Sequence, residues 1–583
     1  MSRYLFTSNL DTFDLLKNQN KVTLNTTWAT IRAYKKINIS SAICFNDGSN
    51  WIVGVGSFMY KSKTGEEALS MIISEFSASK IPDLKKVIRG IYSFAIYKNE
   101  VVYFFNDYYG LFETIYGIVE EKGYYVGTNL ADIIPILPKC EINEFPFMLH
   151  CFAYGNFSNE GLVSGSYKLA GNEYLIANKE KLEKVIIDEL DYSVSIPDFC
   201  DVDQAINYLV SQIRDVVSDI KSCYGPSTLS ITGGLDSRLV LGALTHDRGN
   251  LSKLIYGESK NFFLSTHPED KIVAKELSTL TSVPLDVYDW TNPEGNSIID
   301  LDWQEQLFSQ VGFFNTPYGG NRLFVETITD PQNGPYIEFG YFLEAIRTRD
   351  WVDSEKGTTF SIDDYINNIY SIFNKLPYKN KDSFIIWLKE LFKTKTAILG
   401  ISNYDEIPLS KVNEIEWIFR ERITDSGMHR FLNYYMYAFP IFAVPQIHEF
   451  IIKLPHEIIK KGKFQISLIK ALNPQLLKIN IFSHRHKYRI NRKNEKTMVL
   501  DFKNIATWFR YRLPRLYEFL LSKYQRRKYK FTQQDNGLFL EQILSLKGDT
   551  ADYLDIAKYD GDVTLLFKLR QAMLAFKFSS IKK

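Results

Sequence analysis

The chain of 583 residues has few cysteines and an almost balanced charge, and each shortage excludes a class of protein. Its five cysteines form no C-x-x-C pair, which argues against a zinc site and against a disulfide framework, and favours the reduced thiols of a cytoplasmic protein. The 69 Lys and Arg residues are balanced by 68 Asp and Glu residues, so the net charge is +1. No global field attracts nucleic acid or an anionic membrane, and we expect neither as a partner.

Long apolar runs are also absent. No stretch reaches the roughly 18 apolar residues of a membrane span, and the first segment, MSRYLFTSNLDTFD, lacks the apolar core of a signal peptide. We therefore expect a soluble, cytoplasmic protein. The chain is too long for one compact core, because domains usually contain about 150 residues.

The region up to residue 195 is rich in β-branched and aromatic segments that are separated by Asn, Gly and Lys turns. The segments that we expect to be strands are Trp51–Tyr60, Tyr92–Tyr97, Val101–Phe105 and Gly123–Val126. Such short strands predict antiparallel, layered sheets. The segment Ile186–Ala205 has mixed polarity and a proline, which is typical of a linker into a second domain.

The stretch Leu229–Leu244, LSITGGLDSRLVLGAL, predicts a short apolar strand, a Gly-Gly turn and a helix. Two adjacent glycines let the backbone approach an anion closely, and Thr232 and Ser237 add hydroxyl donors beside the N–H groups of a helix start. The spacing is not that of a Walker loop, because no lysine follows the glycines. The alternative interpretation is an ordinary turn that Asp236 caps.

The segments around this turn repeat the alternation of strand and helix. A helix is expected at Asp203–Ile220 before the turn, and a strand is expected at Lys253–Tyr256 after it. The segment His267–Trp290 supplies a further helix and strand. This βαβ pattern predicts a parallel sheet with a nucleotide site at the carboxyl ends of its strands.

The order strand, TGGLDS, helix resembles the pyrophosphate loop of the asparagine-synthetase-like ATP-pyrophosphatases, a family that includes β-lactam synthetases and lasso-peptide cyclases. Residues 89–117, RGIYSFAIYKNEVVYFFNDYYGLFETIYG, resemble part of its glutaminase domain. The resemblance implies an α/β fold class with two domains. Residues 1–195 would form a layered αββα domain of the N-terminal-nucleophile type. Residues 196–583 would form a PP-loop synthetase domain, with an adenine-nucleotide α-hydrolase-like parallel sheet and a helical C-terminus.

The resemblance also implies ATP and Mg²⁺ as cofactors. The residues that it assigns to ATP and pyrophosphate are Ile231, Thr232, Gly233, Gly234, Leu235, Asp236, Ser237, Tyr256, Gly257, Phe339 and Gly340. Asp236 and Glu344 are the implied magnesium ligands. The alternatives are that Gly257 is a strand-ending turn, and that Asp270, which matches a family helix, is a solvated acid at a helix start.

Three residues are the implied catalytic groups. Tyr341 follows Gly340, as a tyrosine does in β-lactam synthetases, where it works with a glutamate to deprotonate an amine. Glu421 is the candidate partner of Tyr341, and Lys463 is the candidate for the lysine that neutralises pyrophosphate in the transition state. A core tyrosine and a solvated lysine are the alternative interpretations.

Some positions depart from the family pattern. Phe342 and Leu343 stand where small residues usually lie, and Ala443 or Val444 replaces the Asp of a P-F-x-D turn. Glutaminase chemistry needs Cys after the initiator Met, followed by Gly, whereas Ser2 and Arg3 stand here. The family's glutamine-binding strand reads VGSFMYK in this chain and lacks the amide side chain. We therefore do not expect glutamine to be the nitrogen donor.

The resemblance implies an ATP-dependent carbon–nitrogen ligase that adenylates a small-molecule or peptide carboxylate and joins it to an amine. Three hypotheses stay open: a synthetase that uses a substrate-borne amine, an enzyme that amidates an amino acid or sugar acid with ammonia, and a non-catalytic relative that binds a nucleotide or a partner. A partner protein of a biosynthetic pathway also stays open. The sequence names neither the acid nor the amine.

Overall fold

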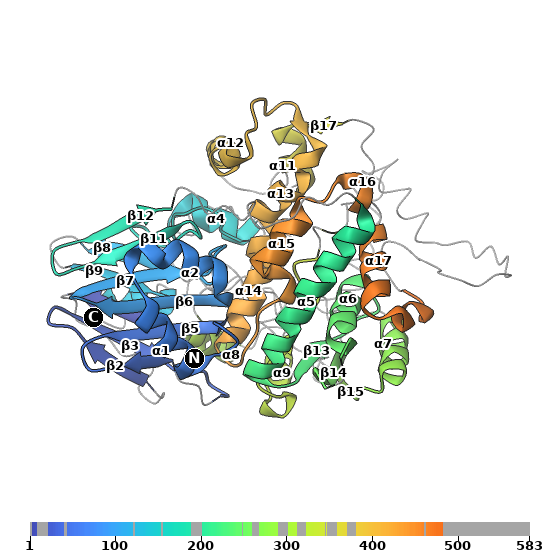
Figure 1. Cartoon of the computed structure of the whole chain (residues 1–583). Coiled ribbons are helices and arrows are strands. Elements are labelled where there is room, and N and C mark those ends of the chain that lie inside the picture. Colours follow the sequence, from blue (N-terminus) through green and yellow to red (C-terminus); the bar gives the residue numbers. More distant parts are fainter. Residues whose placement is uncertain are drawn as a thin grey trace. The chain divides into compact units, whose positions relative to one another are not determined.

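The computed structural model describes residues 3–8, 21–39, 43–119, 123–152, 155–187, 201–247, 249–258, 268–289, 301–311, 322–343, 346, 358–369, 380–459 and 462–481. Within these residues the N-terminal part contains two antiparallel six-stranded sheets, and a parallel four-stranded sheet follows (Figure 1). The predicted α/β fold class, with antiparallel layers before a parallel sheet and a helical region, is confirmed.

The two antiparallel sheets contain the strands that the aromatic and β-branched segments predict. The first sheet has the order β10-β8-β9-β1-β3-β2 and consists of β1 (Arg3–Ser8), β2 (Lys21–Asn25), β3 (Ala29–Tyr34), β8 (Ile115–Val119), β9 (Gly123–Gly127) and β10 (Tyr167–Lys168). The second has the order β12-β11-β7-β6-β5-β4 and consists of β4 (Cys44–Asn46), β5 (Trp51–Met59), β6 (Arg89–Lys98), β7 (Val101–Asn106), β11 (Glu173–Ala177) and β12 (Leu182–Ile186).

The sheets pack face to face through aromatic side chains. The rings of Phe6 and Phe104 lie 5.0 Å apart, and the hydroxyls of Tyr4 and Ser93 are 2.7 Å apart. Helices cover the outer faces of the two sheets. Buried side chains of α1 and α2 pack against the second sheet, and those of α3 pack against the first. The helices of this part are α1 (Gly65–Glu75), α2 (Ile81–Val87), α3 (Leu130–Ile133) and α4 (Glu144–Phe152). The arrangement is the layered αββα order.

The parallel sheet has the strand order β15-β14-β13-β16. Its strands are β13 (Ser227–Ser230), β14 (Leu251–Glu258), β15 (Leu285–Asp289) and β16 (Ile337–Glu338), and its helices are α5 (Val202–Tyr224), α6 (Leu235–Thr245) and α7 (Pro268–Thr281). Leu229 pairs with Glu338 on one side, and Ser230 pairs with Ile255 on the other, so β13 is central. Helix α6 therefore starts between two strand ends.

Further helices lie between β15 and β16 and after β16. They are α8 (Leu301–Val311), α9 (Arg322–Ile328), α11 (Ile362–Ile369), α12 (Lys381–Thr396), α13 (Val412–Glu416), a π-helix (Trp417–Glu421), α14 (Arg422–Asn433), α15 (Pro445–Ile452), α16 (His456–Ile459) and α17 (Lys463–Leu472), with the small hairpin β17 (Thr359–Phe360) and β18 (Ile407–Pro408). Short 3-10 helices span Ala78–Lys80, Ile134–Ile136, Pro331–Asn333, Ala397–Leu399, Leu409–Lys411, Ile441–Ala443 and Pro474–Lys478. Helix α17 packs on both α5 and α6 (Figure 1).

The sequence predicts a domain boundary and the absence of membrane spans. The domain boundary at residue 195 falls in residues 188–200, outside the described residues, and stays a prediction. The described helices include none with the length and apolar character that crossing a membrane requires.

Candidate functional site

The TGGLDS loop connects the carboxyl end of β13 to the start of α6, as the sequence predicts. The main-chain N–H of Ile231 donates to the Ile255 carbonyl (2.9 Å), which fixes the start of the loop against β14. Within the loop, the Ser237 hydroxyl oxygen accepts the Thr232 N–H (3.0 Å) and lies 3.0 Å from the Thr232 hydroxyl. Thr232 is exposed and Gly234 is half-buried, so this corner of the molecule is open to a ligand.

The interpretation of the loop as a turn capped by Asp236 is wrong. Gly234, which has no side chain to form a cap, is the N-cap residue of α6, and its N–H donates to the Thr232 hydroxyl oxygen (3.4 Å). Asp236 lies inside the first turn, where its carboxylate accepts a hydrogen bond from the Gln465 amide (2.7 Å). A helix start without a side-chain cap keeps its positive end directed at the loop, which favours an anion there.

Asp270 is part of the loop environment rather than a solvated acid. It lies on α7 and is only 6% exposed, and its carboxylate accepts the main-chain N–H of Gly233 (2.9 Å). Both glycine N–H groups therefore have partners, because the Gly234 N–H donates to the Thr232 hydroxyl oxygen (3.4 Å). A phosphate would meet the N–H groups of the first turn of α6, with Asp270 holding the turn in shape.

Gly340 approaches the start of α6 so closely that a side chain does not fit. A Cβ atom at this position would lie 2.5 Å from the Ser237 nitrogen and 2.9 Å from the Ser237 Cα. The contacts are with backbone, which has no room to move aside. Gly340 therefore lies against the loop, and the requirement for glycine has a steric cause. Binding of ATP or pyrophosphate by Phe339 and Gly340 stays a prediction.

The start of α17 also contacts the loop. A Cβ atom on Gly462 would lie 3.3 Å from Leu235, and Gln465 donates to Asp236 as described above. Lys463 stands between these two residues in the sequence and is exposed. The structure thus brings the predicted Lys463 backbone to the loop, although the function of its ammonium group stays a prediction.

Tyr256 and Gly257 lie on β14, next to the loop. Tyr256 is buried, and Gly257 is paired with Tyr288 of β15 inside the strand. The strand continues to Glu258, so the interpretation of Gly257 as a strand-ending turn is wrong. Binding of adenine at Tyr256 and Gly257 stays a prediction.

Arg238 is an important residue that the sequence analysis did not single out. Its guanidinium is fully buried and donates to the carbonyls of Gly233 (3.3 Å), Ile479 (2.7 Å) and Asn480 (2.8 Å). Burial lowers the pKa of Arg238 to about 10. The side chain fastens the loop to the end of the chain after α17. The signal was present in the sequence as a charged residue on the otherwise apolar face of α6.

Phe342 and Leu343, which depart from the family pattern, belong to the core. Both are fully buried, and Phe342 has a φ of 60°, a left-handed conformation that bulky residues rarely adopt. Its N–H donates to Asp425 (2.8 Å), and its ring lies 5.5 Å from that of Trp417. Apolar side chains therefore fill the space where the resemblance places small residues.

Tyr341 is half-buried and stacks on Phe339 at 5.6 Å, with the His429 ring 5.5 Å away. Burial lowers the pKa of His429 to about 4, so this ring is neutral near pH 7. Glu421 is 2% exposed and ends the π-helix, an irregularity that is common at functional sites. The pairing of Tyr341 with Glu421 stays a prediction.

One of the two predicted magnesium ligands lies among the described residues. Asp236 is placed at the loop, but Glu344 lies outside the described residues. In the part of the chain that is described, no three His, Cys, Asp or Glu side chains gather to hold a metal. The Asp236 carboxylate offers the oxygen ligands that Mg²⁺ prefers. Magnesium binding at this residue stays a prediction.

Two positions that the resemblance assigns to a glutaminase site make structural contacts. Ser2 lies outside the described residues, whereas Arg3 is fully buried and forms an ion pair with Asp132 (2.8 Å). Ser57, in the segment that should bind glutamine, hydrogen-bonds to the Asn433 side chain and accepts the Ala438 N–H (2.9 Å). These side chains connect the N-terminal strands to the region around α14.

Comparisons with known proteins give low similarity. No protein-family model matches the chain, and no curated protein matches it significantly. Among solved structures it is similar to glutamine phosphoribosylpyrophosphate amidotransferase from B. subtilis complexed with ADP and GMP, with 13% identity and a TM-score of 0.22 over 49% of this chain and 59% of that chain. The likeness thus spans less than two thirds of that protein.

Two further solved structures have similar scores. U34-tRNA thiolase NcsA from Methanococcus maripaludis, with its 4Fe-4S cluster, has 12% identity and a TM-score of 0.22 over 63% of this chain and 86% of that chain. NMN synthetase from Francisella tularensis has 10% identity and a TM-score of 0.18 over 51% of this chain and 100% of that chain. These scores support no family assignment and no functional conclusion, which must come from the residues of the site.

Proposed function

We propose that the chain is an ATP-dependent synthetase that adenylates a carboxylate, releases pyrophosphate, and joins the acyl group to an amine other than glutamine-derived ammonia. The observation that carries this proposal is the convergence of three segments on the start of α6. The TGGLDS loop, the Gly340 turn and the first turn of α17 meet there, and the Gly340 contact leaves no room for a Cβ atom.

The loop provides what a departing pyrophosphate requires. The N–H groups of the first turn of α6 and the exposed Thr232 would stabilise negative charge there, while the buried Ser237 hydroxyl holds Thr232 in place. Lys463, exposed at the start of α17, adds a mobile positive charge. Magnesium on Asp236, if bound together with ATP, would neutralise phosphate oxygens as a Lewis acid.

The choice of amine rests on the N-terminal part. Arg3 and Ser57 stand where a glutaminase would place its glycine and its glutamine-binding strand, and both side chains make structural contacts. Ammonia from glutamine is therefore an unfavourable source of nitrogen. Tyr341, which lies two residues after Phe339 at the edge of the site, is the candidate base for a substrate amine.

A second candidate function is nucleotide or partner binding without chemistry. The observation that favours it is the burial of Phe342 and Leu343, which fill the part of the Gly340 turn where the resemblance implies a loop of small residues. A turn filled in this way has less room for a metal-bound pyrophosphate.

The test is ATP-dependent release of pyrophosphate with magnesium, measured against a panel of carboxylates and peptides. Each acid is combined with glutamine, ammonium or no added amine. Release that depends on one acid but on neither nitrogen source supports the proposal. Dependence on ammonium favours the amidating enzyme, and dependence on glutamine overturns the choice of amine. Binding of ATP without release under any condition favours the binding protein.

A further inference from the structure

A cavity separate from the nucleotide loop lies between the N-terminal strands and the start of α14. Its volume is about 70 Å³, several times the roughly 10–15 Å³ that one water molecule requires in this measure. Lys168 and Glu113 line it from the N-terminal part, and Arg422 and Arg430 line it from α14. A small polyatomic ligand fits this space.

The side chains around the cavity carry an excess of positive charge. Lys168, Arg422 and Arg430 are opposed by the single carboxylate of Glu113, which pairs with Arg430 at 2.6 Å and lies 4.0 Å from Lys168. These four groups leave a charge of +2. Lys395 on α12 adds a further cation, since its ammonium donates to Asn159, another lining residue.

Arg422 is the least compensated of these cations. It begins α14, and its guanidinium makes no hydrogen bond or ion pair with any residue that the structure describes. Burial lowers the pKa of Arg422, and the nearby carboxylate of Asp107 only partly offsets this effect. An arginine that faces a polar cavity without a partner is a binding group that lacks its anion.

The pKa values of the two lysines reflect the same excess of positive charge. Burial, together with the charges of Arg430 and Arg422, lowers the pKa of Lys168 to about 8, although Glu113 opposes this. Burial and the charges of Arg422 and Lys168 lower the pKa of Lys395 to about 7. Cations that depress each other's protonation cost stability, and an anion among them would remove that cost.

We propose that this cavity binds a phosphate group, either as free phosphate or as part of a small phosphorylated molecule. Phosphate carries about −1.5 to −2 charges at pH 7, which matches the uncompensated charge of the lining, and arginine and lysine are its usual partners. The bound group would contact the N-terminal strands through Lys168 and helix α14 through Arg422. It would therefore stabilise the contact between these two parts of the chain.

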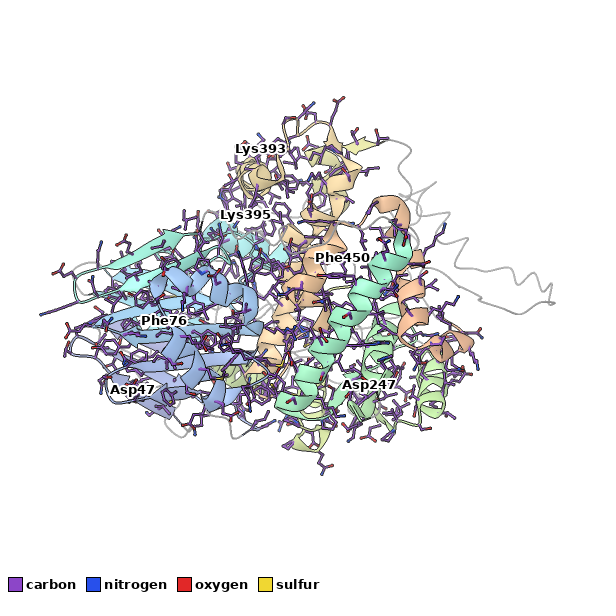
Figure 2. All side chains as sticks on the ribbon, in the orientation of Figure 1. Asp47, Phe76, Asp247, Lys393, Lys395 and Phe450 are labelled. Atoms are coloured by element: carbon purple, nitrogen blue, oxygen red, sulfur yellow. The ribbon has the colours of Figure 1, made fainter. Side chains whose placement is uncertain are left out.

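The test is calorimetric titration of the full chain with inorganic phosphate at pH 7. The variants are Arg422→Gln, Lys168→Gln and Lys395→Gln, and the matched control is Lys393→Gln, an exposed lysine on the same helix as Lys395 (Figure 2). We expect at least tenfold weaker binding for Arg422→Gln and Lys168→Gln, several-fold weaker binding for Lys395→Gln, and a change under twofold for the control.

A further variant separates this cavity from the nucleotide loop. Gly340→Ala disturbs the loop and should leave in place the phosphate binding that Arg422→Gln and Lys168→Gln weaken. If Gly340→Ala removes the binding while Arg422→Gln and Lys168→Gln retain it, phosphate binds at the loop and the proposal is wrong. The absence of phosphate binding in the unaltered chain also overturns it. If Arg422→Gln does not fold, the comparison of Lys395→Gln with Lys393→Gln decides, and equal affinities overturn the proposal.

Two other probes identify the source of the phosphate. Tighter binding of glycerol 3-phosphate than of inorganic phosphate supports a phosphorylated small molecule, and the reverse supports free phosphate. Succinate serves as a carboxylate probe. Displacement of phosphate by an equal concentration of succinate would show that the cavity prefers carboxylates and would contradict the proposal.

Discussion

The start of β1 and the end of β13 are both places where the resembled family carries out chemistry, and they differ in what their polar side chains contact. At β1 the Arg3 guanidinium forms a buried ion pair with Asp132. At β13 the Thr232 side chain stays exposed, and the neighbouring turns of Gly340 and α17 lie against the loop. The comparison teaches that the polar side chain at one strand end is used for packing, whereas the loop at the other strand end leaves a hydroxyl exposed.

The largest effect is expected for Asp236→Ala in the loop. Loss of this carboxylate removes the proposed magnesium ligand at the start of α6 and should reduce ATP–pyrophosphate exchange by roughly 10²–10³-fold. The matched control is Asp247→Ala, which removes an exposed carboxylate just beyond the other end of α6 (Figure 2). Equal exchange rates of the two variants would show that the loop does not act on ATP.

The next largest effect concerns the N-terminal side of the comparison. Asn433 accepts a hydrogen bond from the buried Lys36 ammonium at both its main-chain (2.7 Å) and side-chain (3.2 Å) oxygens. Asn433→Ala removes the side-chain acceptor, and we expect about 2–3 kcal/mol of destabilisation. The check is the midpoint of urea unfolding, with the exposed Asn46→Ala as the control. If both variants unfold at the same urea concentration, the contact does not hold the two parts together.

Gly340→Ala sharpens the comparison from the other side. The new Cβ atom would lie 2.5 Å from the Ser237 nitrogen and push the turn away from α6, which should cost about 1–3 kcal/mol and lower the exchange activity. Gly242→Ala, on α6, is the control, because its Cβ atom would meet nothing nearer than 3.5 Å. We expect Gly242→Ala to be neutral or slightly stabilising. Unfolding midpoints that do not separate the two variants would contradict the steric requirement.

The smallest effect is a dependence of stability on pH. Burial lowers the pKa of His429 to about 4 and that of His448 to about 3, whereas unfolded histidine titrates near 6.5. The unfolded chain therefore binds more protons below pH 6.5, and the stability that is present above this pH is lost as the pH falls toward 4. Each histidine should contribute about 1.4 kcal/mol per pH unit in this range.

The measurement for the histidines is urea unfolding at pH 7 and pH 5. His448 lies against Trp417, with ring centres 3.7 Å apart, so His448→Phe preserves a ring in the core. The variant should lose less stability between the two pH values than the unaltered chain does. An unchanged pH dependence would mean that His448 is already protonated in the folded protein.

The sequence predicts the loop well because local patterns specify it. The apolar spacing around Leu229 and Leu244 requires a strand and a helix, and two glycines require a turn between them, so β13 and α6 appear where expected. The four antiparallel strands that the sequence predicts appear as β5, β6, β7 and β9, with ends that agree to within three residues.

The remaining features depend on contacts between distant residues. The hydrogen bond from Gln465 to Asp236 joins residues 229 positions apart, and no local sequence pattern predicts it. Asp270 could not be assigned from the sequence, because an acid near a helix start is equally common in solvent and in a site. The filling of the Gly340 turn by Phe342 likewise depends on Trp417, which belongs to another segment.

The Arg238 contacts have a consequence for the order in which the molecule forms. The guanidinium joins carbonyl groups that follow it by 238 to 242 residues, among them those of Leu476 and Asn480. Contacts of such long sequence separation form late in folding, because the intervening chain must first lose its conformational freedom. During synthesis the residues of the loop leave the ribosome long before Leu476 and Asn480 do. The TGGLDS loop should therefore acquire its final geometry only after residue 480 has been translated.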